Sequence, residues 1–257
     1  TLIGRLMVAL GLDSSGLDKG SKKATKKLSF LQRQTKAASV GIARSMGAMG
    51  AAFAIGNLVK GAARTVAEFD QKVANLAATS GRSRKDIGAL VDNAIEIGKA
   101  SAFSASEVLS LQTELSKLGN TESEIISMTK SVGDFSVAVG ATASEAAILA
   151  GGVLKSFGKN ASETESVVSS LAVATTKSAL DFQKLNTALP IVSTAAKLSG
   201  ETIESLTAKL GVLADRNIDA STSGTALRNI FLKLKEKGLT YNEAMERIRN
   251  STDSLNE

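Results

Sequence analysis

The feature that most constrains this chain is a series of helix-start patterns separated by glycines. In the pattern Ser/Thr-x-x-Glu, the hydroxyl and the carboxylate bind the free amides at the start of a helix. It occurs at Ser104/Glu107, Thr121/Glu124, Thr142/Glu145, Ser162/Glu165 and Thr240/Glu243, among other places. Glycine commonly ends a helix, and glycines stand near the preceding helix ends at Gly119, Gly140, Gly158 and Gly238. The series therefore predicts a succession of short helices.

Apolar residues between these patterns recur every three or four positions, which is the spacing of one buried helix face. We expect the core to contain Ile87/Leu90/Ala94/Ile97, Val108/Leu111/Leu115/Leu118, Ile125/Met128/Val132/Phe135/Val139, Phe182/Leu185/Leu189/Val192/Ala196, Ile203/Leu206/Leu210/Leu213 and Leu227/Ile230/Leu234. Pro190 falls inside the fourth set, so that helix either kinks or divides at Leu189. Because the chain has one proline and is only 4% aromatic, the sequence predicts an all-α array of short amphipathic helices. Helix starts 17 to 21 residues apart suggest stacked helix pairs, without establishing a sequence repeat.

Residues 1–64 differ from the rest of the chain in charge. They hold 11 Lys and Arg against two Asp, a net charge of +9, whereas residues 65–257 are close to −3. The alternation of Leu6, Val8, Leu10 and Leu12 fits a short N-terminal strand. A lysine-rich helix over Lys19–Lys36 either has a solvated basic face or contacts nucleic acid or another acidic surface. Its single aromatic residue, Phe30, does not support specific recognition of bases.

Residues 45–63 are rich in glycine and alanine, and the segment Ser45–Val59 carries no charge. As a helix it would be about 22 Å long, which is short of a bilayer's hydrocarbon core of roughly 30 Å. Spacings such as Gly47/Ala51 would let another helix approach closely. Three interpretations remain open: packing or self-association, a flexible hinge, and contact with a membrane.

These features divide the chain into three parts. We expect a basic arm with a long helix over 1–64, a compact helical domain over 65–237, and the start of a further helical segment over 238–257. The chain lacks an initiator Met, and we expect it to be a piece of a longer protein.

The composition excludes several kinds of catalytic site. Histidine and cysteine are both absent, which removes Ser-His-Asp triads, cysteine nucleophiles and the commonest ligands of transition metals. The stretch Gly152–Asn160 superficially resembles a phosphate-binding loop, but it has five residues between its glycines and Asn160 in place of Ser or Thr. The sequence therefore predicts no catalytic, cofactor-binding or metal-binding residues and no cofactor.

Several segments resemble the shared domain of phage tail tape measure proteins, also called phage minor tail proteins. They begin with Glu68-Phe69-Asp70 and include the sequences AFSASE (102–107) and ATASEAA (141–147). The most specific part is Leu180–Leu234, which contains Gly224-Thr225-Ala226-Leu227-Arg228. The resemblance covers roughly residues 65–237.

This resemblance implies a structural protein rather than an enzyme. A tape measure protein occupies the lumen of the tail tube in several copies, templates tube assembly, sets tail length and is released when the genome is delivered. Its implied partners are further copies of itself, the tail tube protein, tail assembly chaperones and baseplate or tail-tip proteins, with transient membrane contact through Ser45–Val59. The implied location is the virion, after assembly in the host cytoplasm. The alternatives are a helical scaffold or a membrane-active component of a contractile injection or secretion system.

Overall fold

The computed structural model describes residues 65–253, which are helical and contain no strand. Residues 65–80 form one helix, in which Phe69, Val73 and Leu76 are buried. The helices that follow are α4 (Gly88–Ala100), α5 (Ala105–Lys117), α6 (Glu122–Val139), α7 (Ala143–Phe157), α8 (Thr164–Lys177), α9 (Phe182–Leu198), α10 (Ile203–Asp215), α11 (Ala220–Glu236) and α12 (Tyr241–Asp253). The all-α prediction is confirmed. The expected strand over 6–12 and the long helix expected within 1–64 lie outside the described residues.

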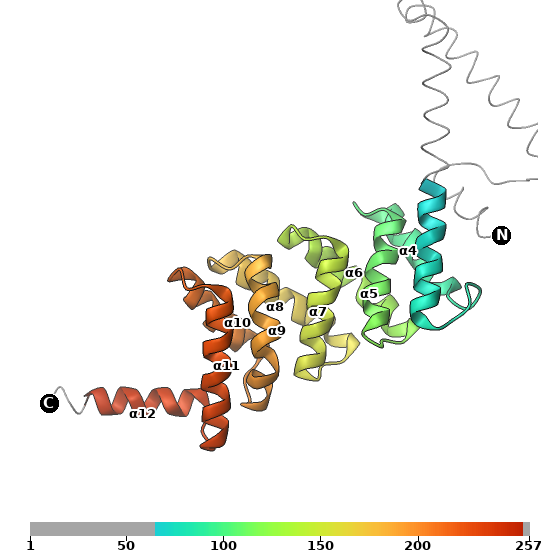
Figure 1. Ribbon diagram of the computed structural model, residues 1–257. Coiled ribbons are helices and arrows are strands. Elements are labelled where there is room, and N and C mark those ends of the chain that lie inside the picture. Colours follow the sequence, from blue (N-terminus) through green and yellow to red (C-terminus); the bar gives the residue numbers. More distant parts are fainter. Residues whose placement is uncertain (1–64, 254–257) are drawn as a thin grey trace, which may run out of the picture. The chain divides into compact units, whose positions relative to one another are not determined.

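The chain divides into two compact units, residues 1–74 and 75–257. In the second unit the helices pack in two rows. Contacts join α5 to α7, α7 to α9 and α9 to α11 in one row, and α4 to α6, α6 to α8 and α8 to α10 in the other. Figure 1 shows α5, α7, α9 and α11 side by side, with α6, α8 and α10 behind them. Packing between near neighbours along the chain is typical of helical solenoids.

The helix starts follow the sequence closely. Capping boxes form at Ser104, Thr121, Thr142 and Thr240, and in each the Glu three residues later accepts hydrogen bonds from the capping residue's N–H and hydroxyl. The prediction at Ser162/Glu165 is wrong. The N–H of Asn160 instead donates to Glu163 Oε2 at 2.8 Å, and a 3₁₀ turn, Ala161–Glu163, leads into α8.

Glycines end the helices as predicted. Gly119, Gly140, Gly158 and Gly238 all have φ between 64° and 82°, a left-handed conformation that other residues seldom adopt. Pro190 does not divide the helix at Leu189, because α9 continues through it from Phe182 to Leu198. The carbonyl that loses its hydrogen bond belongs to the exposed residue Asn186, where water can replace the missing donor.

The core consists mainly of the predicted residues, but Ile97, Leu118, Val139, Leu213 and Leu234 are only partly buried, and one predicted residue is exposed. On α11, Ile230 is 42% exposed, whereas Phe231 is fully buried beside Leu227. The α9–α11 contact is close: a Cβ atom added to Gly224 would lie 3.0 Å from the backbone oxygen of Ala188. Gly224, Leu227 and Phe231 are all buried on one face of α11, so the face that contacts α9 at Gly224 includes residue 231 rather than residue 230.

Candidate interaction surface

A groove runs between α8 and α10, neighbours in the second row, and its volume is about 550 Å³. Its walls are mostly small side chains, with valines and a few charged residues among them. They are Ser166, Ser169, Ser170, Val173, Ala174, Lys177 and Ser178 on one side, and Glu204, Thr207, Ala208, Gly211, Val212 and Asp215 on the other. Both valines are largely accessible to solvent: Val173 is 54% and Val212 is 61% exposed.

The α8 wall of the groove is formed by small residues that recur one helical turn apart. Positions 166, 170, 174 and 178 are Ser, Ser, Ala and Ser, so one side of α8 is nearly flat. At one end the walls approach closely, since a Cβ atom added to Gly211 would lie 2.9 Å from Ser178 Oγ. The groove was not predicted from the sequence, although this four-residue spacing of small side chains is a readable signal for it.

Hydrogen bonds between the two helices fix the width of the groove. The hydroxyl of Ser170 donates to Glu204 Oε1 at 2.9 Å, and the N–H of Ala179 donates to Asp215 Oδ1 at 2.6 Å. Glu204 thus joins α8 to α10, and Asp215 joins α10 to the turn that follows α8.

The charge state of Glu204 agrees with this structural role. A hydrogen bond from its own backbone N–H lowers the pKa of the Glu204 carboxyl, and hydrogen bonds from Ser170 and Thr202 and the nearby charge of Lys159 lower it further. A carboxylate in the first turn is also favoured by the helix dipole. Glu204 is therefore ionised at neutral pH. The geometry of the groove suits packing against another apolar or small-residue surface.

A second hollow, of about 240 Å³, lies where the ends of α7 and α9 meet the starts of α8 and α10. Lys159 and Glu163 form an ion pair of 2.7 Å at its edge. Their hydrogen bond raises the pKa of Lys159 and lowers that of Glu163. Both side chains are solvent-exposed, and exposed ion pairs contribute little to stability.

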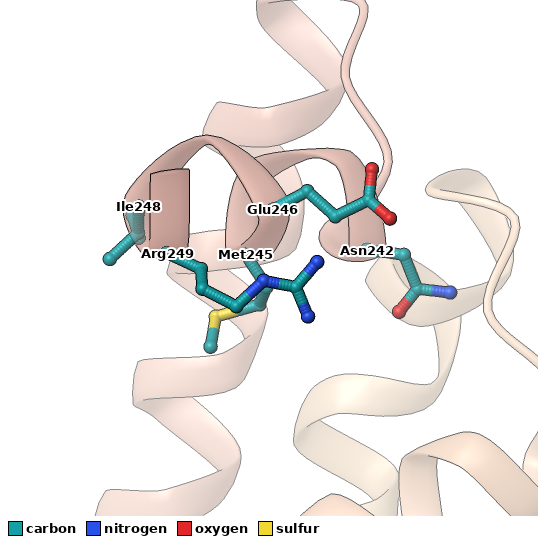
Figure 2. A pocket seen from close by; sticks show the side chains of 5 residues that line it. All are labelled: Asn242, Met245, Glu246, Ile248 and Arg249. Carbon is teal, nitrogen blue, oxygen red and sulfur yellow. The ribbon is translucent and has the colours of Figure 1, made fainter. Parts of the chain in front are cut away.

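A third space borders α12, and its described lining residues all come from this one helix (Figure 2). They are Asn242, Met245, Glu246, Ile248 and Arg249. Met245 is 47% and Ile248 is 60% exposed. Apolar and charged groups therefore alternate along this side of α12.

The stretch Gly152–Asn160 does not form a phosphate-binding loop. It lies in the last turns of α7 and the turn after it, where Gly158 caps the helix with φ of 64°. Within residues 65–253, no cluster of three or more potential ligand side chains could hold a metal ion. The predicted contact segments Lys19–Lys36 and Ser45–Val59 lie outside the part of the chain that the structure describes.

None of the described helices has, by itself, both the length and the apolar character of a membrane span. Only α6 and α7 taken together meet these criteria, and the chain bends by 113° between them. Both helices contribute buried residues to the array, among them Val132 and Leu149.

Comparison with known proteins identifies the family. The family model described as "Phage-related minor tail protein" matches residues 91–257, well over half of the chain. The tape measure protein of Pneumococcus phage Dp-1 is 24% identical over 181 residues, which cover 70% of this chain and 16% of that protein. The probable tape measure protein of Escherichia phage P2 is 28% identical over 170 residues, covering 65% of this chain and 21% of that protein.

The chain thus spans about a fifth or less of the length of these two relatives. No solved structure matches it. The family match begins within α4 and extends through the two-row helical array. The chain belongs to the family of phage-related minor tail proteins, and its resemblance to phage tail tape measure proteins is confirmed.

Proposed function

We propose that this chain is the helical domain of a tape measure protein that lies in the lumen of the tail tube. There it templates assembly of the tube, contributes to setting tail length, and leaves when the genome is delivered. The observation that carries this proposal is the family match over residues 91–257, together with two relatives named as tape measure proteins. A structural role in the phage tail follows from that family, and the lumen and the release are the proposed refinements.

The proposed partners follow from this location. They are further copies of the same protein, the tail tube protein, tail assembly chaperones during assembly in the host cytoplasm, and baseplate or tail-tip proteins. The glycine- and alanine-rich stretch 45–63 supports packing between copies, because small side chains let helices approach closely. The same stretch is the proposed point of transient membrane contact.

Cysteine labelling of intact and emptied particles tests the proposed location. The chain has no cysteine, so one introduced thiol is unique within it. Ser123 is exposed at the start of α6, whereas Ala147 is fully buried in α7. Particles would be assembled with a longer protein containing this chain and either Ser123→Cys or Ala147→Cys, then treated with a bulky polyethylene-glycol maleimide before and after genome ejection.

We expect Ser123→Cys to be protected in intact particles and to react after ejection, when the protein has left the tube. Ala147→Cys is the matched control, since it reacts only if the array unfolds. Equal labelling of Ser123→Cys before and after ejection would place the domain on the outside of the particle and contradict the proposal.

A further inference from the structure

We propose that the junction between α11 and α12 is a latch centred on Tyr241. In the latched state, Tyr241 contacts Phe231 of α11 and Lys209 of α10. When these contacts are lost, α12 detaches as a unit while the array α4–α11 stays folded.

The ring of Tyr241 is contacted by two different groups. Its centroid lies 6.2 Å from that of Phe231 with an interplanar angle of 68°, an edge-to-face arrangement that aromatic pairs favour. The ammonium nitrogen of Lys209 lies 4.3 Å from the same centroid, within the range of a cation–π interaction. Tyr241 is the first residue of α12, so these contacts hold the helix at its start.

Hydrogen bonds to residues outside α12 hold the ammonium group of Lys209 in position. It lies 2.7 Å from Glu201 Oε2 and donates to Ser205 Oγ at 2.6 Å, and the Ser205 hydroxyl in turn donates to Glu201 at 2.6 Å. The side chains of Lys209 and Glu201 are only 15% and 8% exposed. Because water is largely excluded, the charge of Lys209 acts on the ring more strongly than a fully solvated lysine would.

Beyond its first residue, α12 makes few contacts with the rest of residues 65–253. Among the described helices its main contacts are with α11, and none of residues 241–251 is buried. Its start is stabilised locally, since the N–H and hydroxyl of Thr240 donate to Glu243. An isolated helix of 13 residues is marginal in water. A released α12 would therefore lose the protection of its amide hydrogens.

The array, in contrast, does not depend on Tyr241. Apart from its ring contact with Tyr241, Phe231 accepts a hydrogen bond of 2.9 Å at its backbone oxygen from the hydroxyl of Ser199 at the end of α9. The close α9–α11 contact at Gly224 lies two turns away from Phe231. These contacts keep α11 in place when α12 is free, which is what makes the junction a latch rather than part of the core.

Hydrogen–deuterium exchange of the 257-residue chain, read by mass spectrometry on peptides from each helix, tests the proposal. Tyr241→Ala removes both ring contacts, and we expect exchange in α12 to accelerate roughly tenfold. Lys209→Met keeps the aliphatic side chain and removes the charge, so exchange in α12 should accelerate roughly threefold or more. In both variants, exchange in α4–α9 should be unchanged.

Two matched controls isolate the cause. Tyr241→Phe retains the ring and should exchange like the unaltered chain. Lys130→Met removes an exposed lysine that pairs with Asp134 on α6, and it should leave α12 unaffected. Unchanged exchange in α12 for both Tyr241→Ala and Lys209→Met would overturn the latch, as would acceleration of equal size in α9 and α12.

Discussion

Replacing Gly224 by alanine tests the close contact that orients α11. Alanine is favoured over glycine in a helix interior by about 1 kcal/mol. At position 224, however, the added Cβ would lie 3.0 Å from the oxygen and 3.2 Å from the Cα of Ala188, both backbone atoms of α9. Crowding of this kind costs about 1–3 kcal/mol. We therefore expect Gly224→Ala to leave stability unchanged or to lower it by up to about 2 kcal/mol.

Gly152→Ala is the matched comparison. Gly152 also lies inside a helix, α7, and a Cβ added there would meet nothing within 4 Å. It should gain the full helix propensity, about 1 kcal/mol. Because both variants gain the same propensity, the difference between them isolates the crowding at Gly224 and should be about 1–3 kcal/mol.

Urea unfolding of the 257-residue chain, followed by far-ultraviolet circular dichroism, measures this difference through the two midpoints. Equal slopes in the transition region would show that the variants expose the same surface on unfolding. If Gly224→Ala is stabilised as much as Gly152→Ala, the α9–α11 contact is looser than described and the explanation for the orientation of α11 fails.

The remaining predictions use unfolding measurements of the same kind. Phe231→Ala should lower the free energy of unfolding by about 3–5 kcal/mol, because it empties a fully buried site. Ile230→Ala should cost about 1 kcal/mol or less, because that side chain is 42% exposed, and equal costs would mean that the register of α11 is wrong. Thr142→Ala should cost about 1 kcal/mol through loss of the α7 cap, and no measurable cost would contradict that role. Hydrogen bonds from Thr142 lower the pKa of Glu145 below its usual 4.5. The ionised Glu145 carboxylate therefore stabilises the folded chain above pH 4.5, and this contribution is lost as pH falls through the lowered pKa. Glu145→Gln should reduce this acid sensitivity in a pH series, and an unchanged pH profile would contradict it.

The helix boundaries were readable from the sequence because their determinants are local. A capping box joins residues three positions apart, and a left-handed glycine ends a helix without help from the rest of the chain. This explains why the helix starts predicted at Ser104, Thr121 and Thr142 were correct. The error at Ser162 arose because two patterns overlap, Asn160/Glu163 and Ser162/Glu165. Both are plausible helix starts, and the upstream pair forms the contact.

The arrangement of the helices could not be read in this way. On α11 both Ile230 and Phe231 lie within a helical step of Leu227, so the sequence spacing alone does not decide which faces the core. The decision is made by the contact of Gly224 with Ala188, residues 36 positions apart in the sequence. The two rows and the α8–α10 groove likewise depend on contacts between helices that are not adjacent in the chain.

The most direct test of a tape measure role is tail length, measured by electron cryo-microscopy. Particles would be assembled with a longer protein that contains this chain and carries an internal deletion outside residues 65–257. An extended helix contributes about 1.5 Å per residue, so a deletion of about 70 residues should shorten the tail by about 100 Å. Replacing the deleted residues by an unrelated helical sequence of equal length should restore the original length. Tails of unchanged length after the deletion, in particles that still contain the protein, would contradict the proposed role in setting tail length.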